Sequence, residues 1–118
     1  MNTKKIIELQ EQINQIKQHL FELGEMRPGS LSVQYNVCGN PACKCKHPQN
    51  PEKHGPYNQL SYTFKGKSRT EFVKQDMVAQ TKRQLENYKT FKRLTAQWVE
   101  LSVELAKLRK KENEGEKK

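Results

Sequence analysis

The sequence predicts an α+β protein in which two long helices flank a small β-hairpin module. Apolar residues recur at steps of three and four near both ends of the chain, and the period changes to two between residues 60 and 72. All three cysteines gather in the segment before that change. The chain has 118 residues, of which 33% are hydrophobic and 30% charged, so its core is expected to be small. A bound metal or oligomerisation would then add stability.

A heptad seam predicts a first helix from about Thr3 to Leu23. Its apolar positions are Ile6, Leu9, Ile13, Ile16, Leu20 and Leu23. Gly24 stands where a helix C-cap is expected, and Pro28-Gly29 prevents continuation. The seam is two positions wide per heptad, which is typical of packing against another helix. Residues 1–24 therefore form the predicted N-terminal heptad helix.

The central module, residues 25–73, begins with a cysteine segment that predicts a zinc site. Its candidate ligands are Cys38, Cys43, Cys45 and His54. Three thiolates and an imidazole complete the tetrahedral shell of a structural zinc, although the paired Cys-x-x-Cys knuckles of a zinc ribbon are absent. His47 is a rival fourth ligand, and we favour His54 because it leads into the predicted hairpin. The reducing cytosol and the odd number of cysteines favour metal ligation over disulfides. The alternative to a zinc site is that the cysteines are reduced, partly buried thiols.

Alternating apolar residues predict a zinc-stapled hairpin between residues 60 and 72. A three-residue loop at 65–67 would place five residues on one face: Leu60, Tyr62, Phe64, Thr70 and Phe72. A two-residue loop at Lys65-Gly66 would mix apolar and charged residues, so we favour the longer loop. The alternation in residues 31–35 allows a third strand.

Residues 74–111 contain neither glycine nor proline and predict a long C-terminal helix. Its apolar stripe consists of Val78, Thr81, Leu85, Tyr88, Phe91, Leu94, Trp98, Leu101, Leu105 and Leu108. The stripe shifts by about one residue near Phe91, which indicates two packing neighbours. We expect one to be the first helix, in an antiparallel coiled-coil-like pair, and the other to be the central module or a second protomer. Residues 112–118 lack apolar side chains and predict a disordered tail.

The net charge of +9 favours a polyanionic partner. Residues 1–24 carry three lysines against three glutamates, so the excess lies in the middle and C-terminal parts. The candidate phosphate-contacting residues are Lys44, Lys46, Lys65, Lys67, Arg69, Lys82, Lys89 and Arg93. Each of them, taken singly, also fits an ordinary solvated charge. The aromatic residues of the hairpin could stack on bases, but their spacing of two predicts core positions.

The sequence shows no nucleophile–base constellation and no acidic cluster for two catalytic metals, so we expect no enzyme activity. No apolar stretch reaches the about 20 residues that span a bilayer, and the N-terminus lacks the apolar region of a signal peptide. A cytoplasmic protein without membrane contact is expected.

Several motifs together resemble a short, largely uncharacterised family of bacterial and archaeal proteins associated with mobile elements and transposases. They are Met26-Arg27-Pro28-Gly29-Ser30-Leu31, the Tyr35-to-Cys45 knuckle, His54-Gly55-Pro56-Tyr57, Leu60-Ser61-Tyr62, Gly66-Lys67-Ser68-Arg69-Thr70 and Glu86-Asn87-Tyr88. The resemblance covers roughly residues 20–108 and implies a metal-binding knuckle and a mobile-element setting.

Two functions compete on these grounds. The first is a non-catalytic nucleic-acid-binding accessory protein that contacts phosphates of duplex DNA or structured RNA through the hairpin and the long helix. The second is a coiled-coil adaptor or inhibitor that binds a protein partner through its seam, at positions such as Ile13 and Ile16, with a purely structural zinc. Either protein is expected to form homo-oligomers through its apolar seams.

Overall fold

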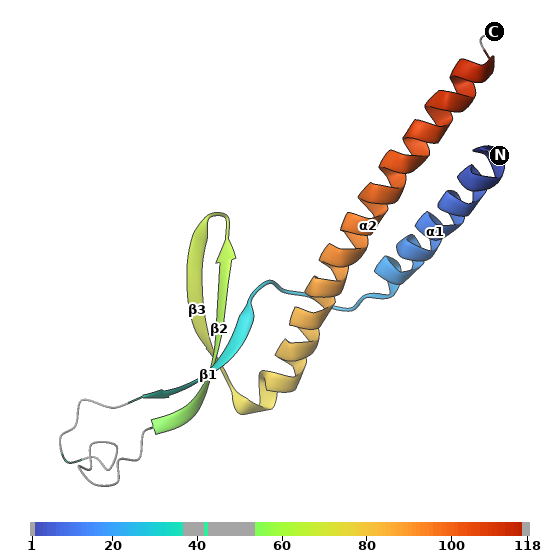
Figure 1. Ribbon diagram of the computed structural model, residues 1–118. Helices are drawn as coiled ribbons and strands as arrows, with labels where there is room; N and C mark the ends of the chain where they lie inside the picture. Colours follow the sequence, from blue (N-terminus) through green and yellow to red (C-terminus); the bar gives the residue numbers. More distant parts are fainter. Residues whose placement is uncertain (1, 37–41, 43–53, 117–118) are drawn as a thin grey trace. The chain divides into compact units, whose positions relative to one another are not determined.

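The computed structural model describes residues 2–36, 42 and 54–116. Its elements, shown in Figure 1, are α1 (Asn2–Glu22), β1 (Ser30–Asn36), β2 (His54–Phe64), β3 (Lys67–Val73), the 3-10 helix η2 (Gln75–Met77) and α2 (Val78–Glu116). The α+β class is confirmed, with two helices and a three-stranded antiparallel sheet. The chain divides into a helical unit, residues 1–25 and 87–118, and a sheet unit, residues 26–86.

The predicted seam of α1 is confirmed as the core of the helical unit. The buried apolar residues of this unit are Ile6, Leu9, Ile13 and Ile16 of α1 and Leu94 of α2. The helix ends when the Leu23 N–H donates a hydrogen bond to the Leu20 carbonyl at 3.2 Å, an i to i−3 bond that tightens the last turn. Gly24 has no positive φ, so the expected left-handed glycine cap is not what ends α1.

Two hydrogen bonds tie α1 and the residues that follow it to α2, and α1 lies alongside residues 87–116 of α2 (Figure 1). The Thr3 hydroxyl donates to Glu112 Oε1 at 3.1 Å, and Asn87 Nδ2 donates to the Glu25 carbonyl at 2.8 Å. The first of these bonds lies beyond Lys111, the predicted end of the second helix. α2 instead continues to Glu116.

The sheet has the order β1-β2-β3, and its core lies on the face that carries Leu60. Leu60 is fully buried, and Thr81 and Leu85 in the first turns of α2 are buried in the same unit. The Arg27 N–H donates to the Gln84 carbonyl at 3.2 Å, and the Arg27 guanidinium pairs with Glu71 on β3. The third strand allowed by residues 31–35 is confirmed as β1, and it pairs with β2 from His54 to Ser61.

The predicted three-residue hairpin loop is wrong. Phe64 pairs with Lys67, so the loop contains only Lys65 and Gly66. Both loop residues have positive φ, 51° and 77°, as in the type I′ turn whose twist matches that of the flanking strands. The turn geometry therefore sets the register, and it places apolar and charged residues opposite one another.

Candidate nucleic-acid interface

The hairpin extends past the third strand as a two-stranded ribbon (Figure 1). The β1–β2 pairing stops where Ser30 meets Ser61, whereas β2 and β3 remain paired through Tyr62–Arg69, Thr63–Ser68 and Phe64–Lys67. We call residues 62–69 the ribbon. Its strands are held by their own ladder, so both of its faces are free of a third strand.

Cations dominate the side chains of the ribbon. Lys65, Lys67 and Arg69 are all exposed, and Lys65 Nζ lies 5.3 Å from the centroid of the Phe64 ring. The ribbon contains no acidic residue. The next acid along β3 is Glu71, which the Arg27 side chain already pairs. The ribbon is thus a compact concentration of uncompensated positive charge.

Polar side chains occupy the second face of the ribbon. The Thr63 and Ser68 hydroxyls lie 3.2 Å apart across the strands and hydrogen bond to each other. Residues of alternating parity point to opposite faces, so these hydroxyls lie opposite the face of Phe64, Lys67 and Arg69. The ribbon therefore offers cations, hydroxyls and one exposed aromatic ring to a ligand that surrounds it.

The other predicted basic residues do not belong to the ribbon. Lys82 is exposed on α2 within the sheet unit, and Lys89 and Arg93 are exposed on the part of α2 that belongs to the helical unit. Steps of seven and four residues place these three on one side of a helix. Lys44 and Lys46 lie outside the described residues.

The predicted zinc ligands lie almost entirely outside the described residues. Cys38, Cys43, Cys45 and the rival His47 are among the residues not described, and the side chain of His54 is not described either. The backbone of His54 begins β2. Among the residues that the structure describes, no group of three His, Cys, Asp or Glu side chains could hold a metal ion.

The strands nevertheless bring the two ends of the cysteine segment together. His54 is the cross-strand partner of Asn36, two residues before Cys38. Gly55 follows in β2 with φ +140°, and a Cβ atom there would lie 2.8 Å from the Gln34 carbonyl oxygen. Only glycine accommodates that conformation and approach without strain. β1 and β2 are therefore closely packed where Gln34 approaches Gly55.

The aromatic residues that were predicted to be core are largely on the surface. Phe72, Phe64 and Tyr57 are 69%, 55% and 38% exposed. The two-residue turn explains the exposure of Phe72, because a register change by one residue moves the side chains of β3 to the opposite face. Phe64 keeps the face of Leu60 but lies beyond the end of the pairing with β1. The available signal was Gly66 in the second loop position, which type I′ turns favour. Trp98 of the predicted apolar stripe is half-buried, with Lys17 Nζ 5.2 Å from its ring centroid.

The fold and its surface define a small α+β protein that carries a cationic β-ribbon. A family model described as "Domain of unknown function (DUF6788)" matches residues 6–83, about two thirds of the chain. The chain belongs to this family. The match runs from α1 through the sheet to the first turns of α2. It confirms an uncharacterised family, and its description names neither mobile elements nor a cysteine motif.

No curated protein and no solved structure matches the chain significantly. Within the described ranges, none of the helices combines the length and apolarity that crossing a membrane requires.

Proposed function

We propose that this protein is a non-catalytic nucleic-acid-binding accessory protein whose ribbon contacts the phosphate backbone. The observation that carries the proposal is the ribbon itself: Lys65, Lys67 and Arg69 are exposed, and no acid lies among residues 62–69. Phosphate neutralisation by Lys and Arg supplies most non-specific affinity for nucleic acids. The major groove of duplex DNA is about 12 Å wide and admits a two-stranded ribbon. Duplex DNA or a structured RNA is the proposed ligand.

The exposed cations of α2 would extend this contact. Lys82, Lys89 and Arg93 can each neutralise one phosphate, as can Lys44 and Lys46. A set of this size predicts binding that weakens steeply as salt rises. Nothing in this role requires a catalytic group, so the protein would act by binding alone.

A structural zinc held by Cys38, Cys43, Cys45 and His54 is part of the proposal. The pairing of Asn36 with His54 supports it, because these two residues flank the segment of the sequence that holds the three cysteines. When bound, zinc would fix the segment by thiolate and imidazole coordination. Lys44 and Lys46 are neighbours of these ligands in the sequence.

The setting that we propose is a mobile element in the cytoplasm, on the strength of the motifs between Met26 and Tyr88. We also propose that the helices pair in antiparallel fashion. Two bonds support this. The first links Thr3 near the start of α1 to Glu112 near the end of α2, and the second links Glu25, just after α1, to Asn87, which lies nearer the start of α2.

A charge-reversal experiment tests the proposed binding. Fluorescence anisotropy with a labelled duplex should show that Lys67→Glu/Arg69→Glu weakens binding about tenfold or more and lowers the log–log salt slope by about 2. The matched control is Lys4→Glu/Lys5→Glu, which makes the same charge change at exposed positions of α1. If both double variants weaken binding equally, net charge rather than the ribbon is responsible. If the wild type binds no duplex DNA and no structured RNA, the proposed function is wrong.

One observation favours the adaptor as a second candidate. Val99 and Val103 are 62% and 50% exposed, and they line a surface groove on α2 with Ser102 and Ala106. Ile13 and Ile16, expected to bind a partner, are instead buried within the helical unit. A protein partner or a second copy would therefore use the groove on α2. Sedimentation velocity tests this: Val99→Asp should abolish self-association if a second copy occupies the groove.

A further inference from the structure

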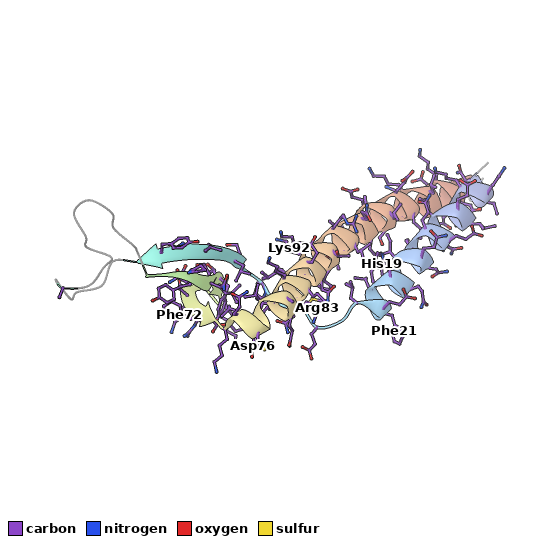
Figure 2. All side chains as sticks on the ribbon, turned by 90° about the horizontal axis from the view of Figure 1, so that it is seen from below. His19, Phe21, Phe72, Asp76, Arg83 and Lys92 are labelled. Atoms are coloured by element: carbon purple, nitrogen blue, oxygen red, sulfur yellow. The ribbon has the colours of Figure 1, made fainter. Side chains whose placement is uncertain are left out.

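Two aromatic side chains meet on the sheet where β2 begins and β3 ends. Tyr57 of β2 and Phe72 of β3 contact each other edge to face, with ring centroids 6.0 Å apart and planes inclined by 61°. Phe72 is 69% exposed, and Figure 2 shows it projecting from the sheet. An exposed pair of this kind adds little to a core. It leaves most of the Phe72 side chain open to solvent.

The rings line a surface pocket with a polar rim. Its rim includes Asn58, Lys74 and Gln75. Asn58 Nδ2 donates a hydrogen bond to Gln75 Oε1 at 3.0 Å, which orients both amides. An amide side chain has one carbonyl acceptor and one NH₂ donor group. With this bond formed, the Asn58 carbonyl can still accept a hydrogen bond from a ligand and the Gln75 NH₂ can still donate one. The pocket thus combines an aromatic face, an amide edge and a cation.

We infer that this pocket binds an unpaired nucleobase of a single-stranded nucleic acid. Phe72 would stack on the base, the amides would meet its edge, and Lys74 would contact the adjoining phosphate. These are the three kinds of contact that single-strand binding proteins combine. The inference rests on the proposed function and adds a ligand class to it. The cations of the ribbon alone would not distinguish single-stranded from double-stranded nucleic acid.

Charge favours a nucleic acid over an apolar protein segment as the occupant. The pocket carries Lys74 at its rim, and its lining contains no acid. Arg69 lies on the same strand, about 10 Å from Phe72 at 3.4 Å per residue. The strand pairing places Arg69 on the opposite face of the sheet from Phe72, so Lys74 is the cation that a strand bound in the pocket meets.

The test measures single-strand and duplex binding side by side with the full chain. The probes are a labelled oligothymidylate of about 12 nucleotides and a labelled duplex of about the same length. Phe72→Ala should weaken oligothymidylate binding about 5- to 150-fold, the range expected for one aromatic–base stack, and change duplex binding less than about twofold. Phe72→Trp should retain binding, and its added tryptophan emission should be quenched on binding. Phe21→Ala, at an 86% exposed phenylalanine of α1, is the matched control and should bind like the wild type.

Each outcome decides the inference. Phe72→Leu keeps an apolar side chain but removes the π face, so binding equal to the wild type would overturn stacking. Unchanged oligothymidylate binding by Phe72→Ala, with duplex binding retained, would overturn the pocket and leave the proposed function standing. Failure of the wild type to bind either ligand would remove both. Phe72 is exposed, so these variants are expected to keep the wild-type circular dichroism spectrum.

Discussion

Replacing Gly29 with alanine should destabilise the sheet unit by an amount that the structure allows us to estimate. Gly29 has φ +128°, and a Cβ atom there would lie 2.8 Å from the Ser61 carbonyl oxygen on β2. A non-glycine residue in such a conformation costs about 1–3 kcal/mol, and the reduced freedom of the unfolded alanine chain offsets about 0.4–1 kcal/mol. The collision adds to the cost because a backbone oxygen cannot rotate away. The expected net loss is about 2–3 kcal/mol.

Gly66→Ala is the matched control for this prediction. Gly66 has φ +77°, but nothing lies within 4 Å of the position that a Cβ atom would take, so strain alone should cost about 1 kcal/mol or less. Thermal unfolding would be followed by the amide NMR signals of β2, because Trp98 belongs to the helical unit. At about 4–8 °C per kcal/mol, Gly29→Ala should melt about 8–24 °C below the wild type. Equal melting temperatures for the two variants would refute the steric argument.

Three further predictions test the fold and the metal. Leu60→Ala should lower the free energy of unfolding by about 2–5 kcal/mol, because this side chain is fully buried. Phe64→Ala, at a 55% exposed position, should lower it by less than about 0.5 kcal/mol. Equal losses for the two variants in the same unfolding assay would contradict the assigned core. Arg27→Ala should cost no more than about 1 kcal/mol, with a smaller loss at high salt, because its ion pair with Glu71 is partly exposed. Elemental analysis should find about one zinc per chain, lost in Cys43→Ser; a folded wild type without metal would exclude the zinc site.

Helical periodicity predicted α1 well because the burial of one apolar stripe determines how this helix packs. Ile6, Leu9, Ile13 and Ile16 are buried in the expected stripe, and α1 ends at Glu22, one residue before the predicted end. A seam of this kind depends on spacing within a single helix. It therefore needs no knowledge of what lies elsewhere in the chain.

The sheet was harder to predict because its register depends on the turn. Alternation located the hairpin, but Lys65 adopts φ 51°, and the resulting two-residue loop moves Phe72 away from the face of Leu60. The apolar pattern alone favoured the opposite choice. β2 also begins at His54, six residues before the predicted start, because pairing with β1 supports a stretch that contains glycine and proline.

The candidate site was also predictable only in part. The cations of the ribbon were predictable because charge near a hairpin loop is exposed in either register. The pocket at Tyr57 and Phe72 was not, since the face on which Phe72 lies depends on one residue of register. Its amide rim also requires the bond between Asn58 and Gln75, which lie 17 residues apart in sequence.

An NMR titration of the full-length, isotope-labelled protein with a short DNA duplex is the sharpest test of the ribbon as a nucleic-acid-binding element. We predict that amide signals of residues 62–69 shift first and most, and that those of α1, residues 2–22, stay in place. Shifts confined to α1 or to the groove at Val99, or a spectrum that the duplex leaves unchanged, would contradict this role of the ribbon.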